Sequence, residues 1–401
     1  MSARGPSTGG TDISGHLSET HSMFTKWFGA SYDLQALDAV LAAGASREFP
    51  GDPPWLLVIG GSGAAKTETI MPLGGAGGQI MSTISGEAAL LSGTPKKEHA
   101  ADATGGVLRK IGDSGLLVIK DVTSILSMNR DTRAQVLAAL REIYDGYWYR
   151  DIGSDGGRRL EWKGRLVVVG AVTTAWDQAH SVIASMGDRF ALVRIDSSDN
   201  RLAAGLQALH NVDKEPVMRA ELAGTVSMLI KAAVPPAGLI ESEMLAVLAR
   251  ADLVTRARTG VERDYAGNVI CAHAPEMPTR FAKQLAQLWR GGMAIGMTPA
   301  DAFEMTLRCA ADSIPPLRLA ALCDVAGHQL SSTTEVCKRL QLPRKTVDRV
   351  LQELQLLDLL TVDDGQRGWL YTLDEKVDLE VLRSLQRVAR NVTPPGKDPN
   401  P

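Results

Sequence analysis

The feature that most constrains this chain is a glycine-rich segment that follows an apolar run and precedes a helix. Trp55-Leu56-Leu57-Val58-Ile59 has the pattern of a fully buried strand. It leads directly into Gly60-Gly61-Ser62-Gly63-Ala64-Ala65-Lys66-Thr67. A strand, a glycine-rich bend and a helix that begins at Lys-Thr direct several backbone N–H groups toward one anionic site. The segment therefore predicts a phosphate-binding loop; the simpler interpretation is a glycine-rich turn without a ligand.

The loop also predicts which atoms contact a nucleotide. Lys66 would reach the β- and γ-phosphates of ATP, and the Thr67 hydroxyl would hold Mg²⁺. The common pattern has glycine before the lysine, whereas this chain has Ala65. A methyl group at this position is tolerable if Ala65 keeps an ordinary helical φ. The predicted ATP-binding residues are Gly60, Gly61, Ser62, Gly63, Ala64, Ala65, Lys66 and Thr67.

Other apolar runs predict the rest of an α/β core. Leu116-Leu117-Val118-Ile119 and Leu166-Val167-Val168-Val169 are bounded by glycine or charged residues and are separated by helical segments. Buried strands that alternate with helices form a parallel sheet with helices on both faces. After Asn200 the pattern becomes helical. We therefore expect an α/β nucleotide-binding core followed by a helical lid.

The composition limits the number of domains and the kind of partner. The 401 residues are 44% hydrophobic and carry a net charge of −3, values typical of a folded globular protein. The length exceeds that of one usual core, so we expect a large and a small domain. A chain with a net charge near zero does not coat nucleic acid through an overall positive charge, so any contact with DNA must be local.

These patterns divide the chain into five segments. Residues 1–22 are expected to form a disordered arm, 23–200 the α/β core, 201–312 the helical lid, 313–378 a small C-terminal domain, and 379–401 a helix with a disordered tail. No apolar run is long enough to span a bilayer, and the start has no signal-peptide pattern. The four cysteines have neither metal nor disulfide spacing, which suits a reducing compartment. We therefore expect a cytoplasmic protein without a membrane partner.

The segment from 313 to 378 has its own pattern, with helices followed by two short strands. Ser332 to Glu335 fits a capping box, and Pro343 suits the first turn of the next helix. The arrangement is similar to a winged helix-turn-helix, in which one helix reads the major groove and the wing touches the DNA backbone. Its acidic residues keep the module from being strongly basic, so the alternative is a winged helix that contacts proteins. The candidate DNA contacts are Arg344, Lys345 and Arg349 on the helix and Arg367 after the wing turn.

A second candidate DNA contact lies between residues 147 and 163. Aromatic residues flank Ser154-Asp155-Gly156-Gly157, a pattern typical of a β-hairpin. Arg158 and Arg159 lie near its tip, and Lys163 ends its second arm. In a ring, two guanidinium groups per subunit would meet a nucleic-acid backbone. The alternative is a hairpin that packs on its own domain, with its arginines in solvent.

An ordered set of motifs resembles the minichromosome maintenance (MCM) helicases, a branch of the AAA+ ATPases. The loop of that family also ends in Ala-Lys-[Ser/Thr], as Ala65-Lys66-Thr67 does. Residues 85–93 and 112–119 are similar to the stretch that carries the family's helix-2 insert and Walker B strand. The hairpin occupies the place of the family's pre-sensor 1 hairpin, which points into the central channel. The resemblance covers about residues 50–310.

The resemblance implies roles for four further residues. Thr173 occupies the sensor 1 place, and Arg280, in Pro278-Thr279-Arg280-Phe281, the sensor 2 place. Arg189, in Gly187-Asp188-Arg189-Phe190-Ala191-Leu192, is the implied arginine finger that a neighbouring subunit inserts. Where the family has Asp-Glu, this chain has Lys120-Asp121, so either Asp121 serves both Mg²⁺ and water or hydrolysis is slow. The implied catalytic residues are Asp121, Thr173, Arg189 and Arg280.

The implied function is that of an ATP-dependent DNA motor. The fold would be an AAA+ P-loop NTPase core with a helical lid and a C-terminal winged helix, assembled as a homo-oligomeric ring for which we expect six subunits. The compact chain resembles MCM-like replicative helicases or replication initiators of phages and mobile elements, with single- or double-stranded DNA and replication proteins as partners. Two alternatives stay open, an ATP-switched DNA-binding regulator with weak hydrolysis and a helicase loader. Strand displacement that depends on ATP separates the motor from the regulator.

Overall fold

The computed structural model describes residues 13–93, 105–153, 157–177, 179, 189–196, 200–365 and 368–389. Several predicted features lie outside these residues, namely the hairpin tip at 154–156, Gly187 and Asp188 before Arg189, and Arg367. Among the described helices, none combines the length and the apolar character needed to cross a membrane.

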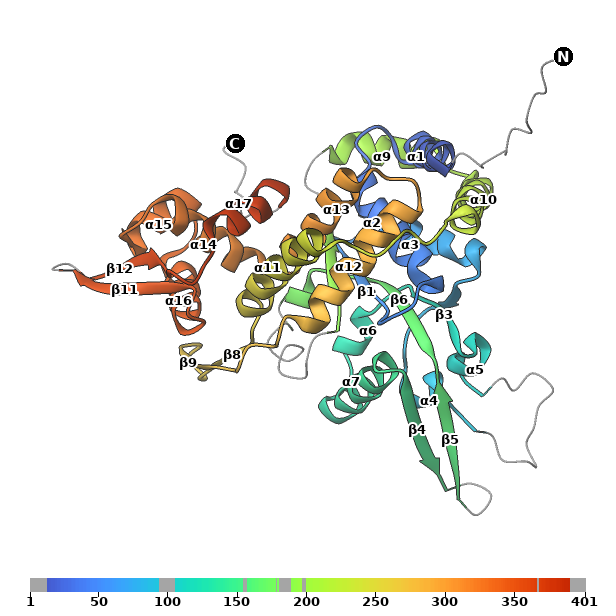
Figure 1. Cartoon of the computed structure of the whole chain (residues 1–401), viewed down its shortest axis with the longest axis horizontal. Helices are drawn as coiled ribbons and strands as arrows, with labels where there is room; N and C mark the ends of the chain where they lie inside the picture. Colours follow the sequence, from blue (N-terminus) through green and yellow to red (C-terminus); the bar gives the residue numbers. More distant parts are fainter. Residues whose placement is uncertain are drawn as a thin grey trace.

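A five-stranded parallel sheet forms the centre of the molecule (Figure 1). Its order is β2-β3-β6-β1-β7, and every neighbouring pair is parallel. All five residues of β1 are buried, because β6 and β7 lie on either side and helices cover both faces. The predicted α/β core and its three apolar strands are thus confirmed. The strand bounds are β1 (Trp55–Ile59), β2 (Gln79–Met81), β3 (Ser114–Ile119), β6 (Arg165–Val172) and β7 (Ala191–Arg194).

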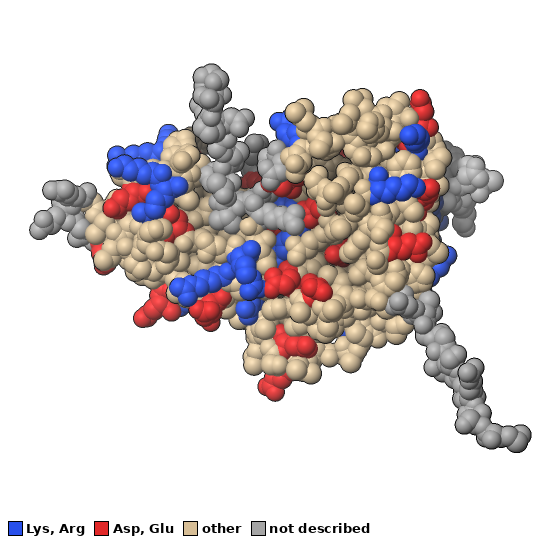
Figure 2. Space-filling model, turned by 90° about the horizontal axis from the view of Figure 1, so that it is seen from above, with Lys and Arg blue, Asp and Glu red and all other residues tan. Residues whose placement is uncertain are grey.

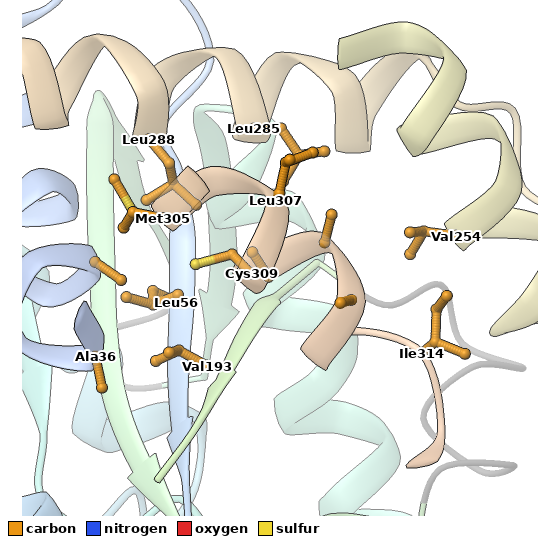
Figure 3. Packing of buried hydrophobic residues seen from close by; sticks show 14 of the residues in the cluster. Ala36, Leu56, Val193, Val254, Leu285, Leu288, Met305, Leu307, Cys309 and Ile314 are labelled. Atoms are coloured by element: carbon orange, nitrogen blue, oxygen red, sulfur yellow. The ribbon is translucent and has the colours of Figure 1, made fainter. Parts of the chain in front are cut away.

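Alternate residues of β1 enter two different apolar cores, as the period of a strand requires. Leu56 and Val58 pack with α2 (Leu34–Ala45), α12 (Thr279–Ala294) and α13 (Pro299–Asp312). Figure 3 shows Leu56 and Val193 of the sheet beneath side chains of α12 and α13. Trp55, Leu57 and Ile59 point to the other face and belong to the second core, which includes residues of α7 and the hairpin. On that side lie α4 (Glu87–Leu90), α5 (Val107–Ile111), α6 (Thr123–Leu126), α7 (Arg130–Tyr144), β4 (Tyr147–Ile152) and β5 (Arg158–Lys163).

The N-terminal segment differs from the prediction. Residues 1–22 were expected to be a disordered arm, but α1 begins at Ile13 and extends to Phe28. Its buried residues recur at helical spacing and face α10 (Glu215–Ala232), where Glu221 accepts hydrogen bonds from Lys26 Nζ at 2.6 Å and Trp27 Nε1 at 2.8 Å. This partner lies some two hundred residues away in the chain, so a local reading of the composition could not reveal it.

The segment after residue 200 is mainly helical, as predicted, with one addition. A two-stranded hairpin interrupts the helices between α11 and α12. The helices α12 and α13 lie directly against the central sheet, so this region shares its core with the α/β layers. The further elements here are α9 (Arg201–His210), α11 (Glu241–Ala257), β8 (Val261–Arg263) and β9 (Val269–Ala272).

The C-terminal module packs beside α11 and combines helices with a small antiparallel sheet of order β10-β12-β11 (Figure 1). The predicted capping box is confirmed, because Ser332 N donates to Glu335 Oε2 at 2.8 Å and Glu335 N donates to Ser332 Oγ at 3.4 Å. The apolar residues Val347, Val350, Leu351 and Leu354 of α16 are buried. The bounds are α14 (Pro316–Gly327), β10 (Ser331–Ser332), α15 (Thr333–Leu340), α16 (Arg344–Leu356), β11 (Leu360–Gly365), β12 (Gly368–Leu373) and α17 (Leu379–Val388).

Candidate nucleotide-binding site

The glycine-rich loop connects β1 to α3 (Lys66–Ile70), as the sequence predicts. Lys66 Nζ donates to the carbonyl oxygens of Gly60 at 2.9 Å and Gly61 at 2.5 Å, which holds the ammonium over the start of the loop. An ammonium has three donors, so one remains for a ligand. Thr67 lies exposed in the first turn of α3. The loop therefore presents a fixed cation and an exposed hydroxyl side by side.

Ala65 does not have the helical φ at which its methyl group would be tolerated without strain. Its φ of 54° and ψ of 12° place it in the left-handed region immediately before α3. The chain must turn there, because Ala65 O accepts from Thr69 N at 2.9 Å and thereby begins the helix. A side chain in this region costs about 1–2 kcal/mol, a strain that glycine at the same place would avoid. The Ala-Lys-Thr sequence thus carries a small strain at the site.

The carboxyl ends of β3 and β6 bring Asp121 and Thr173 to the same end of the sheet as the loop. Thr123 joins them, since Thr173 N donates to Thr123 Oγ1 at 3.2 Å and Thr123 N donates to Asp121 Oδ1 at 2.8 Å. Burial lowers the pKa of Lys66, and the negative charge of Asp121 opposes that shift. The predicted residues Lys66, Asp121 and Thr173 thus meet at one end of the strands.

The oxygen atoms of the side chains at this end of the sheet are of the type that Mg²⁺ binds. Mg²⁺ prefers oxygen ligands and is usually held by one or two carboxylates or hydroxyls together with phosphate oxygens. The Thr67 hydroxyl and the exposed carboxylate of Asp121 are such ligands. Among the described residues, no group of three His, Cys, Asp or Glu side chains is arranged to hold a metal by itself. Any Mg²⁺ here would therefore need the nucleotide to complete its coordination.

A cavity of about 500 Å³ opens beside the loop. Its size is that of a small-molecule site. Tyr32 forms part of its wall and is fixed by a 2.9 Å hydrogen bond between its hydroxyl and Thr69 Oγ1 of α3. Tyr32 was not predicted as a site residue, although the aromatic residues at helical spacing before it could have indicated this wall. The other main contributions come from Trp27, Phe28, Asp33, Ile195, Asp196 and the inner side of α9.

A buried ionic network supports the rim of this cavity and was also missed. Arg308 of α13, fully buried, donates to both carboxylate oxygens of Asp33 at 2.6 and 2.5 Å and to Arg194 O at 2.6 Å. Arg194 in turn forms a bidentate pair with Asp177 at 2.7 and 2.8 Å, and its backbone N–H donates to Asp312. The only signal in the sequence is a charged residue at a core-facing position of α13. The network joins the cavity rim, β7 and α13 into one unit.

The two predicted arginines lie together at the other end of the strands. The guanidinium groups of Arg189 and Arg280 lie 5.7 and 6.0 Å from the ring centre of Tyr144, at the end of α7. Arg280 pairs with Glu276 at 2.5 Å, and Arg189 lies 4.0 Å from Asp145. Burial lowers the pKa of Arg189, and the neighbouring charge of Arg280 adds to the effect. The two cations thus share one small surface.

The strand register fixes how far the arginines are from the loop. Arg189 precedes β7, whose Ala191 lies beside Leu56 near the start of β1, whereas the loop follows Ile59 at the end of β1. Five residues of strand separate these ends by roughly 13 Å. Tyr144 also packs against Trp55, the first residue of β1. The arginines therefore face away from the phosphate loop of their own chain.

The predicted hairpin exists as β4 and β5, and it projects from the body of the molecule (Figure 1). Its two arginines lie on opposite faces, because neighbouring residues of a strand alternate. Arg158 lies on the inner face with Leu160 and extends beside Gly93. Arg159 lies on the outer face, where it pairs with Asp151 at 2.9 Å and its guanidinium lies 4.2 Å from the Tyr149 ring centre. Lys163, Tyr147 and Tyr149 share that outer face.

The candidate DNA contacts of the C-terminal module are also divided. Arg344 and Lys345 are exposed at the start of α16. Arg349 is instead half-buried and bound within the chain, because its Nη2 donates to Ala266 O in the turn between β8 and β9 at 2.6 Å. The buried carboxylate of Glu353 pairs with Arg318 at 2.9 Å on the same side of α16. That side of the helix is therefore covered in this structure.

Comparisons with known proteins give distant likenesses. No protein-family model matches the sequence, and no curated protein matches it. Among solved structures, a full-length MCM homolog from Methanopyrus kandleri is similar over 78% of this chain, with 13% identity and a TM-score of 0.41. This chain spans 64% of that protein's length. The active helicase Cch of SCCmec type IV is 12% identical over 92% of this chain and 71% of its own, with a TM-score of 0.35. The NrS-1 C-terminal region in its apo A form is 10% identical, covering 89% of this chain and 75% of its own, with a TM-score of 0.27.

Proposed function

We propose that this chain is an AAA+ ATPase similar to the MCM branch, which hydrolyses ATP at the junctions between subunits and uses it to move on DNA. The observation that carries the proposal is the division of charge between the two ends of the strands. The phosphate loop, with Lys66, Asp121 and Thr173, lies at one end, and the Arg189 and Arg280 pair lies at the other. A head-to-tail row of subunits brings the arginines of one copy to the loop of the next.

Within such a junction, each group has a physical role. The loop N–H groups and Lys66 bind the phosphates, and Thr173 orients the attacking water together with Asp121. When bound, Mg²⁺ neutralises phosphate charge through Thr67 and Asp121. The neighbouring Arg189 and Arg280 stabilise the charge that develops on the transferred phosphoryl group. Such an arginine contributes about 10³–10⁵-fold to the rate in related chemistry.

The DNA contacts in this proposal come from two places. The outer face of the hairpin carries Arg159 and Lys163 beside two exposed tyrosines, and cations with aromatic rings suit single-stranded nucleic acid. The C-terminal module would act as a winged helix that contacts DNA through Arg344 and Lys345, and the sequence predicts Arg367, outside the described residues, as a further contact. In a hexameric ring the hairpins would line a channel. The role would be that of a replicative helicase or initiator of a phage or mobile element, working with replication proteins.

One observation favours the alternative, an ATP-switched DNA-binding regulator or a helicase loader. Asp121 is the acidic residue available after β3, and one of its oxygens already accepts from Thr123 N in the first turn of α6. Lys120 occupies the position where a second carboxylate is expected. Weak hydrolysis with tight ATP binding would follow.

ATP turnover by the purified protein, with and without single- and double-stranded DNA, tests the proposal directly. We expect turnover that DNA stimulates, and none for Lys66→Ala, which lacks the cation beside the phosphates. The matched control is Lys231→Ala, an exposed lysine on α10. Tight binding without turnover would instead support the regulator or the loader. DNA strand displacement then separates a motor from an ATPase that does not move.

Mixing two inactive variants tests whether the site is shared. Lys66→Ala lacks a working loop but retains the arginines, whereas Arg189→Ala retains the loop but lacks the finger. At a mixed junction, the arginines of the first copy meet the loop of the second. We expect turnover to return on mixing; a mixture as inactive as its components would contradict sharing between subunits.

A further inference from the structure

Gln284 is a buried polar side chain at the arginine end of the strands. It lies in α12, one helical turn after Arg280, and only 1% of its surface is exposed. Its amide nitrogen Nε2 donates to Arg189 O at 2.6 Å and to Tyr144 Oη at 3.1 Å. Residues four apart share one side of a helix, so Gln284 and Arg280 face the same way. One side chain thus joins α12, the end of α7 and the segment before β7.

The partners of Gln284 fix the orientation of its amide. A carbonyl oxygen only accepts, so the amide nitrogen must face Arg189 O. The amide oxygen Oε1 is buried and has no hydrogen-bond partner among the described residues. Burying such an oxygen without a partner costs free energy. Methionine would fill a similar space without this cost, so packing alone does not explain the amide.

The two hydrogen bonds act on both arginines. One of them holds the backbone of Arg189, from which its guanidinium extends. The other holds the hydroxyl of Tyr144, whose ring centre lies 5.7 and 6.0 Å from the guanidinium groups of Arg189 and Arg280. Gln284 therefore links the backbone of one arginine, the helix of the other and the ring that both approach.

Gln284 makes these links without adding charge. Figure 2 shows one face of the molecule, on which areas of Lys and Arg adjoin areas of Asp and Glu, and Arg280 itself pairs with Glu276 at 2.5 Å. A carboxylate orders a cation but also offsets its charge, and thereby weakens its attraction for phosphate. A neutral amide orders the arginines and leaves their charge as it is.

We propose that Gln284 is a positioning residue, which holds Arg189 and Arg280 in the arrangement in which they act on phosphates bound by the neighbouring copy. The inference rests on the proposed function, because that function gives the arginines their target. It assigns Gln284 to the copy that supplies the arginines. A change at Gln284 must therefore affect turnover through that copy and not through the copy that supplies the loop.

The mixing experiment can detect this difference between the copies. Gln284→Met keeps the length of the side chain and removes both donors. Placed on the Lys66→Ala copy, which supplies the arginines, it should lower the turnover restored by mixing by about 10–100-fold. Placed on the Arg189→Ala copy, which supplies only the loop, it should leave that turnover unchanged. The Michaelis constant for ATP should stay the same in both mixtures, because the phosphate loop is intact.

The matched control is Gln287→Met, three residues further along α12. Gln287 is 5% exposed, and its Nε2 also donates to a backbone carbonyl, that of Pro50 at 2.8 Å. The control removes the same kind of buried hydrogen bond from the same helix, so it should lower the temperature of thermal unfolding to a similar extent. It should leave the restored turnover unchanged in either copy.

Limited proteolysis tests the positioning without any turnover. The carbonyl that Gln284 binds belongs to the Arg189–Phe190 peptide bond, at which trypsin cleaves. In the full chain without ATP, Gln284→Met should raise the rate of cleavage at this bond by about fivefold, the factor for one lost hydrogen bond. Gln287→Met should leave the rate unchanged.

Equal loss of turnover in both copies would make Gln284 a residue of general stability, and no loss in either would separate it from the arginines; both outcomes overturn the inference. If mixing restores no turnover before Gln284 is changed, the proposed function is at fault. The cleavage rate then judges Gln284 alone, since faster cleavage supports its hold on Arg189 and an unchanged rate overturns it. Should Gln284→Met not fold, Gln284→Asn, with an amide one methylene shorter, replaces it in each measurement.

Discussion

The two ends of the parallel strands are built in opposite ways. At the carboxyl ends, the loop is open, with Ser62, Gly63 and Thr67 exposed around the ammonium of Lys66. At the amino ends, Arg189 and Arg280 are partly covered and lie beside acidic partners and the Tyr144 ring. Under the proposed function, one end would receive phosphate and the other would present positive charge. The two ends would then be halves of one site that a single copy cannot bring together.

The largest expected effect comes from Arg189→Ala. Turnover should fall by about 10³-fold or more, because the charge opposite the phosphoryl group is lost. The nucleotide dissociation constant, measured by titration with a fluorescent ATP analogue, should change less than about threefold if the two ends are independent. Arg383→Ala, at an exposed arginine of α17, is the control. A large loss of affinity in Arg189→Ala would show that the arginine acts on its own loop.

The next effect concerns the buried network that joins the cavity rim, β7 and α13. Arg308→Ala leaves Asp33 and Asp312 as buried carboxylates without their main cation. Such a change destabilises a protein by about 3–5 kcal/mol. Lys283→Ala breaks the exposed pair with Asp52 and should cost at most about 1 kcal/mol. Urea unfolding of both variants measures the difference in the free energy of unfolding. Similar values for the two variants would contradict a stabilising role of the network.

A smaller effect is expected at the hairpin, which joins the amino end of the sheet. Arg159→Ala combined with Lys163→Ala should weaken single-stranded DNA binding and lower its salt dependence by about 1.4 in log–log slope, the value for two phosphate contacts. Fluorescence anisotropy at several salt concentrations measures both. Glu161→Gln, on the same face, removes a negative charge and should not weaken binding. An unchanged slope in the double variant would place the DNA elsewhere.

The smallest effect is expected at Ala65. Glycine takes a φ of 54° without a side-chain clash, so Ala65→Gly should stabilise the protein, by at most about 1 kcal/mol. Thermal unfolding without nucleotide measures this. Ala64→Gly, one residue earlier in the loop, is the comparison and should not stabilise. A loss of stability in Ala65→Gly would mean that the alanine methyl group contributes packing that outweighs its strain.

Local patterns predicted the parts of this structure that local forces determine. The buried strand before the loop, the lysine over the loop and the Ser332 capping box each depend on neighbours within a few residues. The φ of Ala65 was not predictable in this way, because the pattern gives residue types and the turn requires a particular backbone angle. Arg349 donates to Ala266, which lies 83 residues away in the sequence, and α1 contacts α10 across a still greater separation. Such contacts follow from the assembled fold.

For the candidate site, the sequence predicted which residues take part better than it predicted where their side chains lie. It named Lys66, Asp121 and Thr173, and the structure places them at one end of the sheet. It could not show which of Arg158 and Arg159 faces the body of the molecule, because that depends on how the hairpin packs. The role of Arg308 was not predicted, because a single charged residue in a helix is usually on the surface. Burial and register are properties of the packed chain.

The opposite placement of loop and arginines has a consequence for how activity should depend on protein concentration. An isolated subunit would have no complete site, and an open row of n subunits would have n − 1. The specific activity would then rise steeply as the protein is concentrated and level off once rows close into rings. At low abundance the chain would consume no ATP, so its own copy number would serve as the threshold for action.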